Sequence, residues 1–520
     1  MSRPIAKSNR ASNPKSNAVR LKAAAAELRD LLGPARVLGP TRPRDPALRV
    51  RPGTVAELCR AVAALGAAGV AMFPQGGGTH AADDDGLPVN DAAVIELADL
   101  NRIVEINEAD RYVTVEAGCT WAALDAALKA RRVRAGVRAP LVLAPGAATV
   151  GGAVSTNAVC LGSGARGTAN DAVLGLDVVL ADGSLVETGA AAAEGRTPFL
   201  RHFGPDLTGL FLGDCGSFGI KAHVTLPLCG LSAHDACVSF AFERFEDVME
   251  AQVAITRLDV AAAHWALDPA CNDRLAARGI KFLEGLTYTR DVIATAKVLV
   301  DGHRTVMRGG WTLHVAVEGD SEREIELKLG KVRRTLVPTA MKELPGAVAQ
   351  QARGQPFTAF AEWFGPSQDA GWSTLHGLFP LSRAAEIAGV TDEYFIRHRE
   401  AIARHGIDIA TITVGLDRAV LIQPILRWTD PGAAAKSAAA TLRRDLALLW
   451  GAFGASHFGL GTFYPYAGAL SSAALAMVRA MKQTLDPKGL MNPGALGLAQ
   501  PKTMASLKFA EFPQNLLEDH

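Results

Sequence analysis

The sequence lacks an excess of charge of either sign and lacks a long apolar run. Its 54 lysines and arginines stand against 53 acidic residues, and the net charge of +1 offers no electrostatic basis for a nucleic-acid partner. The absence of any run of about eighteen apolar residues argues against a transmembrane segment. We therefore expect neither a nucleic-acid-binding protein nor a membrane-spanning one.

The cysteines also lack a pattern. They form no C-x-x-C motif and no regular framework, which is typical of reduced thiols and not of disulfides or zinc. We therefore expect a cytoplasmic protein. The first 22 residues hold six basic residues and no acid, which predicts a disordered tail, with an organelle-targeting segment as the alternative. The seven cysteines are Cys59, Cys119, Cys160, Cys215, Cys229, Cys237 and Cys271.

Helix and strand signals mix along the 520 residues, a length at which chains divide into domains. Thr54 and Glu57 form a capping box before a helix predicted over 55–67, and Asp182-Gly183 joins two strands of a predicted hairpin. The pattern predicts an α+β protein. Further helices are predicted over 245–258, 322–336, 434–449 and 471–485, and strands over 93–97, 103–107, 112–116, 172–180, 185–188, 219–226, 311–317, 357–363 and 420–428.

Two glycine-dense turns follow apolar runs. The first reads Pro74-Gln75-Gly76-Gly77-Gly78-Thr79-His80, and the second spans 145–153. Adjacent glycines let backbone N–H groups converge with no Cβ in the way, and such a concavity suits a pyrophosphate. No G-x-G-x-x-G fingerprint opens a helix here, which disfavours a Rossmann-type site. An ordinary glycine-rich loop is the alternative for the first turn alone, and the pair of turns favours a phosphate-bearing cofactor.

The glycine turns belong to a longer series of motifs. In chain order these are Arg51-Pro52 before the capped helix, Gly76-Gly77-Gly78-Thr79, Val113-Thr114-Val115-Glu116-Ala117-Gly118, Pro145-Gly146 through Gly151-Gly152, Ala181-Asp182-Gly183, Gly216-Ser217-Phe218-Gly219-Ile220, and Leu485-Asp486-Pro487-Lys488-Gly489-Leu490-Met491-Asn492-Pro493-Gly494. The series resembles the vanillyl-alcohol oxidase and p-cresol methylhydroxylase superfamily of FAD enzymes, and within it the D-lactate dehydrogenase and glycolate oxidase branch. The resemblance is specific over 50–227 and 457–496.

The resemblance implies a fold and a division of the chain. The fold is a two-subdomain FAD-binding domain of the p-cresol methylhydroxylase type, with a second α+β substrate domain and a C-terminal helical return. The division is an N-terminal tail and helix (1–49), the FAD-binding domain (50–228), the substrate or cap domain (229–440), a C-terminal helical segment that returns to the FAD domain (441–500) and a tail (501–520).

The resemblance also implies which residues hold FAD. The pyrophosphate is expected on the first turn, the flavin near the second, the adenine or ribose near Gly219 and Ile220, and Asn492 near the isoalloxazine ring. Some relatives bond the flavin to a histidine, but the matching position here is Thr79, so we expect noncovalent FAD. The expected contacts in the two turns are Gln75, Gly76, Gly77, Gly78, Thr79, His80, Pro145, Gly146, Thr149, Gly151, Gly152 and Ala153.

The sequence departs from the 2-hydroxy-acid members at their metal site. Those members carry an H-x-G-D-G-N-x-H strand motif and a later E-H-G-x-G motif. Here the stretch 411–428, predicted as one strand, contains no histidine, and the later motif reads Ser456-His457-Phe458-Gly459. One histidine beside a serine cannot furnish a His/His/carboxylate site. We therefore predict no catalytic metal.

Oxidation of an alcohol by a flavin needs a base for the hydroxyl proton, and a substrate carboxylate needs a cation. The candidates are His457 beside the later glycines, Tyr464 in a cluster with Tyr466, and Arg427 in the stretch 411–428. For His457 the alternative is a histidine satisfied in the core, and for Arg427 it is a solvent-exposed side chain.

The function implied by the resemblance is oxidation of a D-2-hydroxy acid such as D-lactate to the 2-oxo acid, with hydride transfer to flavin N5. Electrons would pass to a cytochrome or quinone-type acceptor. Two alternatives stay open, which are oxidation of an aromatic or other alcohol and a noncatalytic flavin-binding subunit of an oxidase complex. The expected partners are a small-molecule substrate, an electron-acceptor protein or quinone, and a second copy of the chain in a homo-oligomer.

Overall fold

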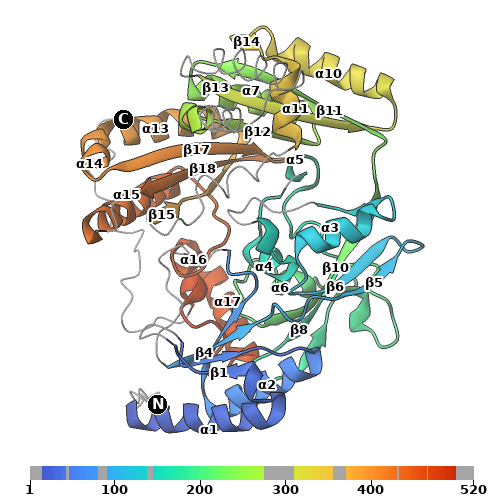
Figure 1. The fold of residues 1–520 in the computed structure, drawn as a ribbon, viewed down its shortest axis with the longest axis vertical. Helices are drawn as coiled ribbons and strands as arrows, with labels where there is room; N and C mark the ends of the chain where they lie inside the picture. Colours follow the sequence, from blue (N-terminus) through green and yellow to red (C-terminus); the bar gives the residue numbers. More distant parts are fainter. Residues whose placement is uncertain are drawn as a thin grey trace, which may run out of the picture.

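The computed structural model describes residues 14–41, 46–79, 91–137, 145–160, 162–274, 310–354, 371–429, 432–464 and 466–498. Within these residues the chain forms three sheets flanked by helices, which confirms the predicted α+β class (Figure 1). The strand predicted over 357–363, the N-terminal residues 1–13 and the tail 501–520 lie outside the described residues. Figure 1 shows the first two sheets in the lower half of the molecule and the third in the upper half.

The first sheet is small and mostly parallel, and it leads into the first glycine turn. Helix α2 begins as predicted, because Thr54 Oγ1 accepts a hydrogen bond from the N–H of Glu57 at 3.1 Å. Helix α1 shares the core of this sheet, so the folded unit starts before residue 50. The prediction of a disordered tail over the first 22 residues was therefore wrong from Pro14 onward. The strand order is β1 (Val37–Leu38), β2 (Leu48–Val50), β4 (Ala92–Glu96) and β3 (Ala71–Gln75), with α1 (Pro14–Leu32) and α2 (Val55–Ala68).

The second sheet is antiparallel and contains the predicted hairpin. Val179 pairs with Leu185 across the Asp182-Gly183 turn. Thr120 caps α3 and Thr149 caps α4, each through its side-chain oxygen. The strand order is β5 (Ile103–Asn107), β6 (Tyr112–Glu116), β10 (Ile220–Gly230), β8 (Gly175–Val179) and β9 (Leu185–Glu187), with β7 (Val133–Ala135) also on β10; the helices are α3 (Trp121–Lys129), α4 (Val150–Thr156), α5 (Ser163–Arg166) and α6 (Leu207–Leu210).

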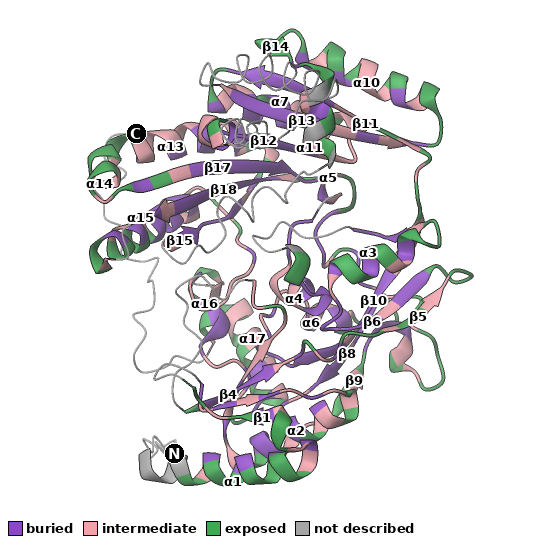
Figure 2. Cartoon of the chain, in the orientation of Figure 1, coloured by how far each residue is buried: buried purple, intermediate pink, exposed green. Residues whose placement is uncertain are grey.

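Most helices of the third sheet pack on one of its faces, whereas Ala352 packs with the opposite face. The strands of this sheet are largely buried (Figure 2). On its other face Val159 and Phe458 pack with strand residues such as Ile412 and Leu421. The order is β14 (Lys342–Glu343), β11 (His234–Phe242), β13 (Trp311–Gly319), β12 (Ala263–Leu267), β17 (Ile407–Gly415), β18 (Ala419–Trp428) and β15 (Gly371–Thr374), with β16 (Gly377–Pro380) also on β18; the helices are α7 (Phe245–Leu258), α10 (Glu322–Leu336), α11 (Gly346–Gly354), α13 (Ala384–Arg397), α14 (Arg399–Arg404) and α15 (Ala433–Ala452).

The strand predicted over 420–428 is confirmed as β18, but its extension back to residue 411 was wrong. The stretch belongs to two antiparallel strands, β17 and β18, because the chain turns at 416–419, where the N–H of Leu416 donates to the carbonyl of Ala419 at 2.8 Å. Arg427 lies directly opposite Asp408 in this hairpin. The division of the chain into domains stays our proposal.

The C-terminal segment returns to the first sheet beside the glycine turn. Helix α17 (Ser472–Leu485), which follows the short α16 (Tyr466–Ala469), ends where predicted and packs on the core of the second sheet. Beyond it, Met491 forms a parallel bridge with Met72 of β3. Segments far apart in the chain therefore meet at β3, as the red and blue ribbons of Figure 1 show.

A buried ion pair holds this return in place. Asp486 is 2% exposed, accepts the N–H groups of Leu490 and Met491 at 2.9 and 2.8 Å, and pairs with Lys482 at 2.7 Å. Lys482 also donates to the carbonyl oxygens of Ser217 and Met491 at 2.6 and 2.9 Å. One charge pair therefore ties the return to the second sheet. Among the described residues, no helix combines the length and the apolar character needed to cross a bilayer.

We expect Asp486→Asn to destabilise the protein by about 3 to 5 kcal/mol, because Lys482 would be left charged and buried without its carboxylate. Denaturant unfolding measures the change. The control is Glu386→Gln, which breaks an exposed pair with Arg383 and should cost about 0 to 1 kcal/mol. Equal shifts of the unfolding midpoint for the two variants would contradict the role assigned to Asp486.

Candidate active site

The two glycine turns lie against each other, backbone to backbone. A Cβ on Gly77 would stand 1.7 Å from the carbonyl oxygen of Ala147, and one on Gly76 would stand 2.4 Å from Thr149 Oγ1. A Cβ on Gly151 would likewise stand 2.5 Å from the Cβ of Ala117. No side chain fits at these three positions, so the glycines are required for the close approach.

A pocket opens along this contact, and most of the predicted cofactor residues line it. Pro145 and Gly146 form a 3-10 turn and are not among the described residues that line the pocket. His80 lies outside the described residues. The predicted residues that line the pocket are Gln75, Gly76, Gly77, Gly78, Thr79, Thr149, Gly151, Gly152, Ala153, Gly219, Ile220 and Asn492.

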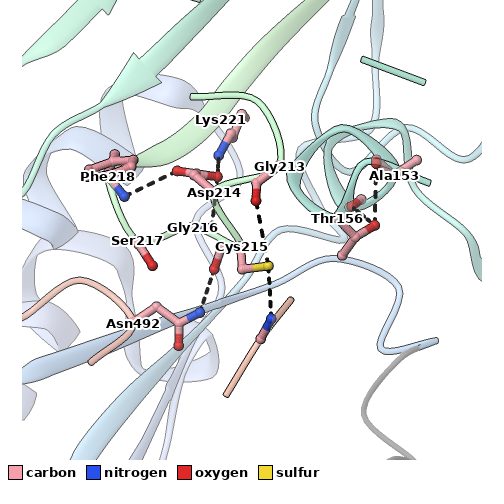
Figure 3. Close-up of polar contacts among 12 residues, drawn as sticks. Ala153, Thr156, Gly213, Asp214, Cys215, Gly216, Ser217, Phe218, Lys221 and Asn492 are labelled. Atoms are coloured by element: carbon pink, nitrogen blue, oxygen red, sulfur yellow. Dashed lines mark hydrogen bonds and ion pairs between the residues drawn. The ribbon is translucent and has the colours of Figure 1, made fainter. Parts of the chain in front are cut away.

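The turn before β10 forms one wall of the pocket. Figure 3 shows the polar contacts within this turn. Asp214 shapes it by accepting the N–H groups of Gly216 and Phe218 at 2.9 and 3.1 Å, and it pairs with the buried Lys221. Cys215 takes a left-handed φ of +51°, and burial raises the pKa of its thiol to about 11. Cys215 and Lys221 flank the predicted Gly-Ser-Phe-Gly-Ile motif, so extending that motif by one residue on each side would have found both.

Asn492 joins the C-terminal return to this wall. Its side-chain amide donates to the carbonyl oxygen of Cys215, and its N–H donates to the carbonyl of Met72 at 2.8 Å (Figure 3). The N–H of Gly461 in turn donates to Cys215 Sγ at 3.2 Å. Two distant segments, at Gly461 and Asn492, thus contact Cys215 and close this part of the pocket.

His376 and Arg443 supply ionisable side chains to the same pocket. His376 connects β15 to β16, is 5% exposed, and stacks on Phe458 with ring centroids 4.0 Å apart. Arg443 projects from α15, is 5% exposed, and holds its guanidinium carbon 3.6 Å above the ring of Phe463. Neither residue lies in a motif, so sequence reasoning missed both.

The predicted catalytic residues take other places. His457 and Tyr464 are not among the described residues that line the pocket, and both contact His376 instead. Their rings stack on each other with centroids 4.1 Å apart. Burial lowers the pKa of His457 to about 4, although the hydrogen bond from its Nδ1 to the carbonyl of His376 at 2.7 Å opposes the shift. Arg427 is also absent from that lining and lies opposite Trp372, on the face of the third sheet that carries Leu421.

The residues of this pocket fit a nucleotide cofactor. The two glycine turns line the pocket with backbone in place of side chains, and backbone N–H groups of such turns suit phosphate oxygens. Gln75 Oε1 is shielded from solvent and has no hydrogen-bond partner among the residues that the structure describes, which is typical of an oxygen that accepts from a ligand hydroxyl or amine. In the described part of the chain, no three His, Cys, Asp or Glu side chains gather in a way that could hold a metal.

Two protein-family models match parts of the chain. "FAD binding domain" matches residues 46–189, and "FAD linked oxidases, C-terminal domain" matches 465–496. The first of these holds both glycine turns, and the second holds Asn492.

Some curated relatives match most of the chain, and others match less than half of it. A probable mitochondrial D-lactate dehydrogenase of Danio rerio is 27% identical over 478 residues, or 89% of this chain and 86% of that one. An FAD-linked oxidoreductase of Mycobacterium tuberculosis is 30% identical over 40% of this chain, and a probable mitochondrial D-2-hydroxyglutarate dehydrogenase of Oryza sativa is 32% identical over 34%. The chain matches only 43% and 30% of the lengths of these last two.

Solved structures match over nearly the whole chain. 4-Ethylphenol oxidase from Gulosibacter chungangensis superposes with a TM-score of 0.73 over 94% of this chain and 99% of that one, at 18% identity. p-Cresol methylhydroxylase gives 0.72 over 92% and 97%, at 15% identity. The chain therefore carries an FAD binding domain and the C-terminal domain of FAD linked oxidases in a fold of the p-cresol methylhydroxylase type, with FAD as its cofactor.

Proposed function

We propose that the protein is an FAD-dependent oxidoreductase that converts a D-2-hydroxy acid to the 2-oxo acid. The observation that carries the proposal is that His376 and Arg443 line the same pocket as the glycine turns. A 2-hydroxy acid needs a cation for its carboxylate and a base for its hydroxyl. The pocket offers one residue for each task.

Arg443 suits the substrate carboxylate. Its guanidinium carbon lies 3.6 Å above the centre of the Phe463 ring, and this contact restrains the group before any ligand arrives. A fixed, planar guanidinium can donate two parallel hydrogen bonds to a carboxylate, whereas a lysine would act only as a point charge. We infer that Arg443 binds the carboxylate and thereby fixes the orientation of the substrate carbon.

His376 suits the hydroxyl proton. Its ring contacts the rings of Phe458 and Tyr464. A Cβ added to Gly459, which lines the pocket, would stand 3.6 and 3.7 Å from Cε1 and Nε2 of His376. When bound, FAD supplies the acceptor for the hydride that leaves the substrate carbon. We infer that His376 Nε2 takes the hydroxyl proton, so the substrate loses a hydride and a proton and becomes the 2-oxo acid.

The two alternatives have less support. A phenol-like substrate would need a free tyrosine hydroxyl, but that of Tyr464 is buried and already bonds the backbone of His376. The phenol-oxidising structures above share the fold at 15% and 18% identity, which carries no substrate assignment. A noncatalytic subunit would have no need of a buried arginine and a histidine in its flavin pocket.

The remaining features are proposals of the same kind. We propose noncovalent FAD, an electron-acceptor protein or quinone, a homo-oligomeric state and a cytoplasmic location. All seven cysteines are free thiols, which agrees with a reducing compartment. Several relatives are named as mitochondrial, and fractionation of the native cells distinguishes the two compartments.

The substrate is identified by bleaching of the flavin under anaerobic conditions. We expect one of D-lactate, glycolate or D-2-hydroxyglutarate to bleach the visible absorbance of the bound flavin, and vanillyl alcohol to leave it unchanged. Bleaching by vanillyl alcohol alone would support the aromatic-alcohol alternative. Bound FAD that none of these compounds reduces would contradict the proposal in favour of a noncatalytic subunit.

We expect His376→Asn to slow flavin reduction by about 100- to 10,000-fold, because the variant loses Nε2 as the general base. Stopped-flow absorbance at saturating substrate measures the rate, and the flavin content should be unchanged. The matched control is His457→Asn, whose amide can still donate to the carbonyl of His376 and whose rate should stay within about tenfold. The reverse ranking would reinstate His457 as the base.

We expect Arg443→Met to raise KM about 10- to 100-fold, because a charge-assisted hydrogen bond contributes about 1.5 to 3 kcal/mol. Arg443→Lys should recover only part of this loss. Steady-state kinetics with the acid identified above measures KM. The control is Arg444→Met on the same helix, where the side chain is half exposed and pairs with Asp445. Equal effects of the two methionine variants would exclude a specific carboxylate site at Arg443.

A further inference from the structure

Tyr464, His376 and His457 form a connected cluster behind the pocket. Tyr464 lies between the two imidazoles, 4.1 Å from the ring centroid of His457 and 5.1 Å from that of His376. Hydrogen bonds join the same three residues. If His376 is the base, as proposed above, this cluster decides which of its ring nitrogens can act.

His457 has a fixed tautomer. Its Nδ1 lies 2.7 Å from the carbonyl oxygen of His376, and a carbonyl oxygen can only accept, so Nδ1 carries the hydrogen. A pKa of about 4, lowered by burial, keeps the ring neutral near pH 7, so Nε2 carries none. Nε2 is also shielded from solvent and has no partner among the described residues. His457 therefore anchors the backbone of His376 and has no proton path of its own.

The hydroxyl of Tyr464 touches three polar atoms of His376. It accepts the backbone N–H at 3.0 Å, and its oxygen lies 3.2 Å from both the carbonyl oxygen and Nδ1. A hydroxyl has one hydrogen to give and two lone pairs. Its hydrogen can therefore go to the carbonyl, which leaves a lone pair for an N–H at Nδ1, or it can go to an unprotonated Nδ1.

The two arrangements have opposite consequences for the chemistry. A hydrogen on Nδ1 leaves a lone pair on Nε2, so the ring can accept a proton from the pocket side. A hydroxyl hydrogen aimed at Nδ1 instead places the ring hydrogen on Nε2, where it blocks proton uptake. The first arrangement also survives the reaction, because a protonated ring needs an acceptor at Nδ1 and the tyrosine oxygen is already there.

We propose that Tyr464 is a positioning residue that holds His376 in the tautomer with its hydrogen on Nδ1, so that the bare Nε2 faces the pocket. The tyrosine hydroxyl bridges the N–H and carbonyl of the same residue, which clamps the backbone of His376 against its ring. The substrate hydroxyl proton then moves to Nε2 and is released to solvent after turnover, and Tyr464 stays neutral throughout.

Nitrogen NMR of the flavin-loaded protein, labelled with ¹⁵N-histidine, tests this assignment. The signal missing from the His376→Asn spectrum identifies His376 in the wild type. We expect its Nδ1 to be of the N–H type and its Nε2 to be of the bare type. The reverse assignment in the wild-type spectrum would overturn the proposal, and this reading does not depend on the folding of any tyrosine variant.

Tyr464→Phe provides a second test. We expect it to remove the Nδ1–H signature and to slow flavin reduction about 10- to 100-fold with KM unchanged, since Arg443 is untouched. His457→Asn should leave the His376 signature as in the wild type. An unaltered signature and rate in Tyr464→Phe would overturn the positioning role. A normal rate in His376→Asn would instead refute the proposed base, and the wild-type tautomer would still be readable.

Discussion

The close approach of two backbones at Gly76 and Gly77 is the constraint on which the rest of the molecule depends. The second turn can meet the first only because neither glycine has a Cβ, and the contact joins β3 of the first sheet to α4 beside the second. The C-terminal return uses the same strand, through Met72. A side chain at this point would separate both sheets and the return at once.

The pocket is built in two different ways. Around the glycine turns, its wall is mostly backbone and small side chains, which suits a cofactor that presents phosphates and hydroxyls. Around His376 and Arg443, large side chains from the third sheet and α15 are fixed by aromatic neighbours. The cofactor half therefore depends on conformation, whereas the other half depends on side-chain identity and can change without loss of the fold.

The sequence predicted the local features well. The cap of α2, the hairpin at Asp182-Gly183 and the helices over 245–258 and 322–336 depend on neighbours in the chain, and the structure has them where expected. The two glycine turns could be assigned to one cofactor site because a bound pyrophosphate needs backbone N–H groups with no Cβ in the way. The turn at 416–419 was missed, since a strand's end is set by its partners in the sheet as much as by its own residues.

The residues of the proposed substrate half of the pocket could not be predicted from local sequence. His457 was chosen for its glycine neighbours, yet its ring faces the carbonyl of His376, because the orientation of a loop side chain depends on packing against distant strands. No local pattern distinguishes His376 or Arg443 from other buried residues.

The bridge between Met72 and Met491 also constrains when the protein can bind its cofactor during synthesis on the ribosome. A nascent chain cannot complete the pocket until α17 and the segment up to Asn492 have emerged, so tight cofactor loading is a late event of biosynthesis.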